Sequence, residues 1–197
     1  MTDWELRQAA ARGEVTPVSL GGRLRIAARA AGLIALLLVF VPLHYIYRTF
    51  SYGSPFPMLF LRYAARVCGA RVKVHGTHLK RDVFFIANHI SWVDILALAG
   101  ASGTAFVEGT TTDGQSLLPF KTSMLSVLEP PPPGVLVQPV ILDYGAVAEW
   151  IGWIGEEGGL NNAKRVLSRK GTFAVHIHYL EPFSPEDFRG RKAISHE

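Results

Sequence analysis

The 197-residue sequence contains one cysteine, Cys68, which excludes an intrachain disulfide and fits a reducing compartment. Only 18% of its residues are charged, whereas 49% are hydrophobic. No dense run of Lys or Arg occurs, so nucleic acid is not an expected partner. The low charge and the apolar excess indicate a membrane-associated globular protein. Its net charge of +4 suits an anionic lipid surface or a phosphate-bearing substrate.

Several enzyme motifs are missing as well. The sequence has no P-loop, no Gly-x-Gly-x-x-Gly pattern and no Ser-centred nucleophile elbow. Cys68 lies in a membrane-proximal stretch, and we expect its thiol to be inert. His176 and His178 alternate on an expected strand and share one face. Metal binding is one interpretation of this pair, but no third ligand stands out beside it, so we expect a solvated face and no metal site.

The longest stretch without charge runs from residue 30 to residue 47. It lies near the lower limit of length for a helix that spans a bilayer. No small-residue cleavage site follows, which argues against a cleaved signal peptide. The flanking arginines place the N-terminal end in the cytoplasm by the positive-inside rule, since three precede the stretch and one follows it: Arg23, Arg25, Arg29 and Arg48.

Two alternatives to a spanning helix stay open. A short apolar run is also compatible with a buried helix of a soluble protein. The second alternative is a re-entrant or interfacial hairpin, because Pro42 can bend the run. Segment 56–66 would form its other arm. There Arg62 and Arg66 share one helical face, and aromatic and leucine side chains fill the other.

By composition the chain divides into a polar, loosely ordered arm (1–22), membrane-anchoring helices (23–69) and an α/β domain (70–197). Strands alternate with helices in the third part, which predicts a mixed sheet flanked by helices. Pro139 cannot donate to a strand ladder, so its strand is expected at an edge or a bulge. We expect strands at 72–75, 83–87, 135–142 and 172–180, and helices at 92–99, closed by Gly100, at 121–128 and at 161–169.

An imidazole stands where the apolar strand 83–87 ends and a helix begins. His89 can take a proton from a hydroxyl near neutral pH, and Asp94 can fix its tautomer and stabilise the imidazolium. A structural alternative exists, since Ser91 and Asp94 also fit the capping box of a helix start. The two interpretations are compatible, because a capped helix would hold Asp94 in place. The pair is therefore a candidate catalytic base with its orienting carboxylate.

A second candidate patch is the turn that contains Glu108, Gly109, Thr110 and Thr111. Its backbone N–H groups and threonine hydroxyls are suited to hold an anion. An ordinary surface loop has the same composition. The patch becomes informative only in combination with the His89 motif.

The order of these segments resembles the glycerolipid acyltransferase family, specifically 1-acylglycerol-3-phosphate acyltransferases of the bacterial membrane type. An anchor comes first, then Asn-His-x4-Asp at 88–94, then Glu-Gly-Thr at 108–110. A weaker match to the family's fourth motif lies at 137–140. The first two motifs together are specific, whereas either of them alone would not be.

The resemblance implies that His89 deprotonates the free hydroxyl of a lysophospholipid and that Asp94 orients it. The hydroxyl then attacks the thioester of acyl-CoA or acyl carrier protein directly, with no acyl-enzyme and no cofactor. Glu108, Gly109 and Thr110 would belong to the acceptor-binding motif, and Pro139 would shape the acyl-donor side. The implied reaction makes phosphatidic acid from lysophosphatidic acid, or acylates another acceptor such as lyso-ornithine lipid, at the cytoplasmic face of the inner membrane.

The sequence departs from the family pattern between Asp94 and Glu108. Only residues 95–107 lie there, whereas family members carry several tens of residues. These normally include a helix, a strand and an arginine that holds the acceptor phosphate. We therefore expect an internal deletion and an incomplete sheet, with Lys121 or Arg71 as possible substitutes for that arginine; the end at Glu197 predicts a short C-terminus as well. The alternative is an inactive relic or a non-catalytic lipid-binding membrane protein.

Overall fold

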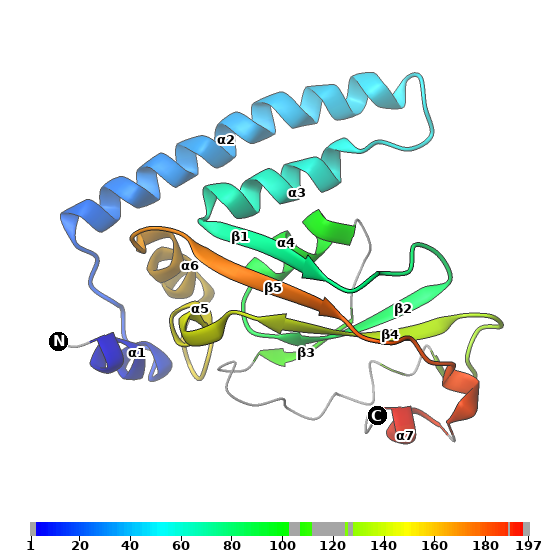
Figure 1. The fold of residues 1–197 in the computed structure, drawn as a ribbon. Coiled ribbons are helices and arrows are strands. Elements are labelled where there is room, and N and C mark those ends of the chain that lie inside the picture. Colours follow the sequence, from blue (N-terminus) through cyan, green and yellow to red (C-terminus); the bar gives the residue numbers. More distant parts are fainter. Residues whose placement is uncertain (1–2, 103–106, 112–124, 126–127, 189, 195–197) are drawn as a thin grey trace.

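The computed structural model describes residues 3–102, 107–111, 125, 128–188 and 190–194. A helical hairpin precedes a mixed α/β layer (Figure 1). The expected helix at 121–128 and Lys121 lie almost wholly outside the described residues. The elements are α1 (Asp3–Ala11), α2 (Leu20–Arg48), α3 (Phe56–Val67), β1 (Ala70–His75), β2 (Val83–His89), α4 (Val93–Ser102), β3 (Val107–Thr111), β4 (Leu136–Asp143), a 3-10 turn η2 (Gly145–Val147), α5 (Ala148–Ile151), α6 (Gly159–Ser168), β5 (Phe173–Tyr179), a 3-10 turn η3 (Pro185–Asp187) and α7 (Arg191–Ile194).

The strands form one open sheet in the order β1-β5-β4-β2-β3. β1 pairs with β5, and β2 pairs with both β4 and β3, in parallel, whereas β4 and β5 are antiparallel. This confirms the expected mixed sheet flanked by helices. β1 and β3 are the edges, so β2 and its C-terminal His89 lie next to an edge.

The strand that contains Pro139 is central, so its expected position at a sheet edge is wrong and the bulge alternative holds. The β4–β5 ladder ends at Val140 and Tyr179, and pairing resumes at Val137 and Phe183. Between these pairs the chain after β5 carries one residue more than β4. The lost donor of Pro139 falls at this irregularity, where its carbonyl still accepts from the Leu180 N–H at 3.0 Å.

The main core lies between one face of the sheet and the helices α3 to α6. Alternate residues of β5 point into it, because successive strand residues face opposite sides. A smaller apolar cluster covers part of the other face with residues that follow β3 and β5: Leu125, Leu128 and Ile194 pack there with Ile86 and Val137. Both faces are thus partly covered, which explains why 83–87 is a continuous apolar run.

α2 has the length and composition to cross a membrane, with a mean hydropathy of 2.3 over its most apolar window. None of that window is buried inside the protein, and Leu38 and Ile34 are 72% and 57% exposed. A core helix of a soluble protein would bury these side chains, so that alternative does not hold. The helix runs through Pro42 without ending there.

α3 folds back along α2, as the hairpin alternative expects for segment 56–66 (Figure 1). The ring of Phe40 on α2 packs between Phe56 and Tyr63, with centroid distances of 6.1 and 5.8 Å. At the other end of α2, Arg25 and Arg29 donate to carbonyls at the C-terminus of α6. Arg25 and Arg29, which the positive-inside rule uses to orient the N-terminal end, thus also cap the C-terminus of α6.

Two expectations about local structure are wrong. The N-terminal arm is not loosely ordered throughout, because α1 forms and buries Ala9 and Ala10. Gly100 does not close α4, which continues to Ser102. A Cβ at residue 100 would lie 2.8 Å from the backbone nitrogen of Arg62, so this glycine lets α3 approach α4 closely.

Candidate active site

β2 ends at His89, and the chain turns at once into α4, which carries Asp94 in its first turn. The His89 Nδ1 lies 2.8 Å from the Asp94 Oδ2, with side chains that are 12% and 2% exposed. The same carboxylate oxygen accepts from the backbone N–H groups of Ile90 at 2.7 Å and Ser91 at 2.9 Å. These bonds hold the carboxylate in one orientation toward the imidazole.

The capping and catalytic interpretations are both present in this geometry. The Asp94 carboxylate accepts from the Ser91 N–H, as a capping box requires. The Ser91 hydroxyl, which is buried, completes no such box with the described residues. With Asp94 on Nδ1, the neutral ring presents Nε2 as the nitrogen that can accept a proton. The structure therefore brings together the two residues that the sequence singled out.

Tyr144, directly after β4, is a third member of this group that the sequence did not indicate. Its hydroxyl donates to the Asp94 Oδ1 at 2.5 Å, and the side chain is buried. Burial, and then the charge of Asp94 and this hydrogen bond, raise the pKa of Tyr144 well above 10, so the phenol stays a donor. Both carboxylate oxygens of Asp94 are thus hydrogen-bonded.

The Tyr144→Phe variant tests this contact. Its loss leaves the Oδ1 of a buried carboxylate without its donor, and we expect about 1.5–3 kcal/mol lower stability. Catalytic turnover should fall as well, but less than on loss of His89. Chemical denaturation measures the first effect. The matched control is Tyr52→Phe, because Tyr52 is fully exposed; equal stability of the two variants would contradict the assigned role.

Three hydrogen bonds, two made by the side chain of Asn88 and one by the backbone N–H of Trp153, tie the turn around His89 to neighbouring segments. The Asn88 amide donates to the Leu142 carbonyl at 3.0 Å and accepts from the Leu142 N–H at 2.7 Å. It extends the link between β2 and β4 beyond the last pair of their ladder, at Ala87 and Val140. On the other side of the turn, the Trp153 N–H donates to the Ile90 carbonyl at 2.9 Å. Residues before and after His89 are therefore both tied to other elements.

A buried polar network supports the start of α4 from α6. Glu157 and Arg165 form an ion pair at 2.8 Å, with side chains that are 0% and 3% exposed. Asn162 donates to Glu157 at 2.9 Å and accepts from the indole N–H of Trp92 at 3.1 Å. Arg165 also donates to the carbonyls of Trp150 and Gly152. The network connects the His89–Asp94 turn to a helix about seventy residues away in the chain.

The Glu-Gly-Thr segment lies in β3, beside the end of β2. Glu108 pairs with Ala87 and Thr111 pairs with His89, with an irregularity between them. The backbone of Glu108, Gly109 and Thr110 is thus adjacent to the candidate base. The ordinary-loop alternative is wrong for these residues, since they form a strand, although their side chains lie outside what the structure describes.

Pro139 lies farther from the candidate base than the Glu-Gly-Thr strand does, because it pairs with Ile86, three residues before His89. Arg71 lies on β1, which two strands separate from β2, or about 14 Å at the usual strand spacing, so it is not beside His89. Burial raises the pKa of the Cys68 thiol to about 11, which fits the expectation of an inert thiol.

Sequence comparison places this chain among known proteins. No family model matches it. It is 30% identical to the lyso-ornithine lipid O-acyltransferase of Pseudomonas aeruginosa, over 60% of this chain and 67% of that protein. The chain belongs to the glycerolipid acyltransferase family. The lyso-ornithine lipid O-acyltransferases of Brucella abortus and Rhodobacter capsulatus are 25% and 24% identical, and the matches cover 88% and 91% of this chain and 91% and 89% of theirs.

The fold agrees with this membership. The crystal structure of the 1-acyl-sn-glycerophosphate (LPA) acyltransferase from Thermotoga maritima superimposes with a TM-score of 0.61, covering 89% of this chain and 91% of that one at 16% identity. The aligned span with the Brucella relative is 243 residues, longer than the 197 of this chain. That acyltransferase therefore contains segments with no counterpart here, as an internal deletion predicts.

Two residues that belong to side-chain clusters in the structure, Tyr144 and His75, were not singled out from the sequence. Tyr144 reaches Asp94 from fifty residues away, and no local pattern marks it. His75 lies beside His176 and His178 on the sheet face away from the helices. The sequence contained a signal for His75, because this residue ends a strand that is expected to alternate apolar and polar residues, as segment 172–180 does. That these two strands pair with each other could not be predicted from the sequence.

Proposed function

We propose that this chain transfers an acyl group from a thioester donor to the hydroxyl of a lysolipid, with lyso-ornithine lipid as the acceptor. One observation carries the reaction type: an imidazole oriented by a buried carboxylate at the end of β2, with the Glu-Gly-Thr strand beside it. The relatives named as lyso-ornithine lipid O-acyltransferases support the acceptor class.

In the proposed reaction, the His89 Nε2 takes the proton of the acceptor hydroxyl as its oxygen attacks the thioester carbonyl. Asp94 stabilises the imidazolium that forms, because the carboxylate lies on Nδ1. The attack forms the new C–O bond of the tetrahedral intermediate, and collapse of that intermediate restores the carbonyl and breaks the C–S bond. The imidazolium then returns its proton to the leaving thiolate, so acid and base are restored without an acyl-enzyme.

The neighbouring residues take positioning roles in this proposal. Glu108, Gly109 and Thr110 lie on the strand next to His89, where the acceptor's polar group would bind. Pro139 lies on the central strand β4, on the other side of β2, and is assigned to the acyl-donor side. The donor is acyl-CoA or acyl carrier protein, both of which present the same thioester.

The membrane is the proposed location, because both acceptor and product are lipids. α2 supports this, since its apolar side chains are exposed and only a bilayer or another apolar surface would cover them. The amphipathic α3 would lie alongside in the interface. We place the protein at the inner membrane, with the α/β domain on the cytoplasmic side where the thioester donors are.

An acceptor assay tests the proposal. The full chain, purified in detergent, is given radiolabelled acyl-CoA or acyl carrier protein with either lyso-ornithine lipid or lysophosphatidic acid. We expect labelled ornithine lipid to form faster than labelled phosphatidic acid. Faster acylation of lysophosphatidic acid would overturn the assigned acceptor and leave the reaction type standing. Absence of product from both acceptors with both donors would support the inactive relic instead.

A further inference from the structure

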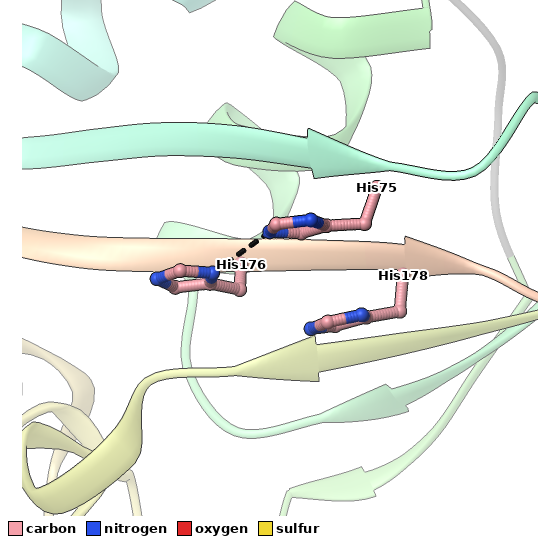
Figure 2. Close-up of side chains that lie close together, drawn as sticks. All are labelled: His75, His176 and His178. Carbon is pink, nitrogen blue, oxygen red and sulfur yellow. Dashed lines mark hydrogen bonds between the residues drawn. The ribbon is translucent and has the colours of Figure 1, made fainter.

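Three histidines meet on the face of the sheet opposite the one that α3 to α6 cover. His75 ends β1, and His176 and His178 lie on β5 (Figure 2). One ring nitrogen of each lies within 4.8 Å of the others, and the His75 Nε2 is 2.8 Å from the His176 Nδ1. His75 is exposed and the other two are half-buried. The cluster is therefore open to small solutes.

The register of the parallel pair β1–β5 creates this cluster. His75 lies directly opposite His178, and Lys73 lies opposite His176. Residues two apart on a strand share a face, so both β5 histidines point to the same side as His75. Asp143 on β4 is paired with His176 from the other side. The polar residues paired with the β5 histidines on the two neighbouring strands are thus Lys73 and His75 on β1, and Asp143 on β4 opposite His176.

The three rings lie nearly parallel. His75 is 5.0 Å from His176 and 4.5 Å from His178 between ring centroids, with interplanar angles of 5° and 11°. Figure 2 shows all three rings projecting in the same direction from the strands. Imidazole binds a metal ion through the lone pair of one ring nitrogen, and each of the three rings offers one such nitrogen to the cluster.

We propose that His75, His176 and His178 bind one divalent transition-metal ion, of the class that includes Zn²⁺, through three imidazole nitrogens. A set made only of imidazole favours Zn²⁺, Cu²⁺ or Ni²⁺ over Mg²⁺ and Ca²⁺, which prefer oxygen ligands. Three protein ligands leave a fourth tetrahedral position for water. This site is separate from the proposed acyl transfer and does not depend on it.

Metal binding requires small side-chain movements. Tetrahedral Zn–N bonds of about 2.0–2.1 Å place the ligand nitrogens about 3.3 Å apart. The His75–His176 pair must open slightly from 2.8 Å, and any nitrogen at the 4.8 Å limit must move inward. The rings must also turn so that each lone pair points at the ion, and χ2 of histidine is a soft torsion. The hydrogen now shared by His75 and His176 moves to a distal ring nitrogen through solvent.

The bound ion would join an edge strand to the interior of the sheet. β1 pairs only with β5 among the described strands, and the α2–α3 hairpin leads directly into its N-terminal end. A link between the C-terminal end of β1 and β5 would fix the strand that carries the hairpin. The expected role of the metal is thus structural, and it should raise the unfolding temperature.

Zinc titration of the metal-free full chain in detergent tests the site. We expect one Zn²⁺ per chain by equilibrium dialysis and calorimetry, a higher unfolding temperature, and no comparable response to Mg²⁺. The His75→Ala variant should bind at least about tenfold more weakly, since even residues that only support a ligand cost about that much. His75 is exposed, so this change should leave the fold intact by circular dichroism.

His78→Ala is the matched control. The His78 ring contacts the Tyr179 ring in a tilted arrangement and lies outside the cluster, so its loss should leave Zn²⁺ affinity unchanged. Equal weakening by His78→Ala and His75→Ala, or unchanged binding in His75→Ala, would overturn the site and indicate only adventitious surface binding. No binding by the unmodified chain would overturn it as well. Co²⁺ provides an independent readout, because its visible spectrum reports tetrahedral nitrogen coordination.

Discussion

Replacing His89 by alanine should lower the rate of acyl transfer by about 10²–10⁴-fold, because the acceptor hydroxyl would lose the general base that we propose for it. The loss should appear in kcat rather than in acceptor KM, since the imidazole acts mainly in the transition state. Initial rates of ester formation from a labelled thioester measure it. The fold should survive, because the His89 side chain is one partner of Asp94 among four.

His78→Ala is the control for this variant, since it removes another partly exposed imidazole, one in contact with Tyr179. It should keep the unmodified rate. If His89→Ala and the unmodified chain transferred the acyl group at equal rates, His89 would not be the general base, although the chain would still be an acyltransferase.

Replacing Glu157 by alanine should destabilise the protein by about 3–5 kcal/mol, because it leaves the buried guanidinium of Arg165 without its counter-charge. Asn162 loses an acceptor in the same change, and through it the Trp92 indole loses support. The free energy of unfolding from denaturant titration measures the effect. Acyl transfer should weaken too, since this network adjoins the turn that carries His89 and Asp94.

The exposed pair of Arg12 and Glu14 offers a matched control. Its side chains are 62% and 56% exposed at the same 2.8 Å separation, and Glu14→Ala should cost no more than about 1 kcal/mol. The double change of Glu157 and Arg165 to methionine should cost less than Glu157→Ala alone, because no unpaired charge stays buried. If Glu157→Ala lowered the free energy of unfolding no more than Glu14→Ala does, the buried ion pair would not make the contribution to stability that we assign to it.

The strands could be predicted wherever local pattern decides them. The apolar run before His89 and the alternation of 172–180 gave β2 and β5 nearly at their observed bounds. Segment 56–66 was identified as a helix because its polar and apolar faces separate at helical spacing. Gly100 was misread, because a glycine that admits a neighbouring helix looks the same in sequence as one that ends its own.

In the candidate site, too, contacts between residues close together in the chain could be predicted, whereas contacts between distant residues could not. His89 and Asp94 are five residues apart across a strand-to-helix turn, so local geometry alone brings the imidazole to the carboxylate. Tyr144 comes from another strand, and its contact depends on how β4 lies beside β2. The bulge at Pro139 was one of two options in the sequence, and only the order of strands shows that β4 is central.

By itself, the sequence determined the apolar helix, the pairing of His89 with Asp94, and the order of motifs that indicates an acyltransferase. These depend on residues close together in the chain, where helix and strand periods limit the possible contacts. Only the tertiary structure decided that Tyr144 completes the partners of Asp94, that Glu157 and Arg165 support the turn, and that His75 joins His176 and His178. Those contacts depend on strand order and register, which long-range packing sets and no local pattern encodes.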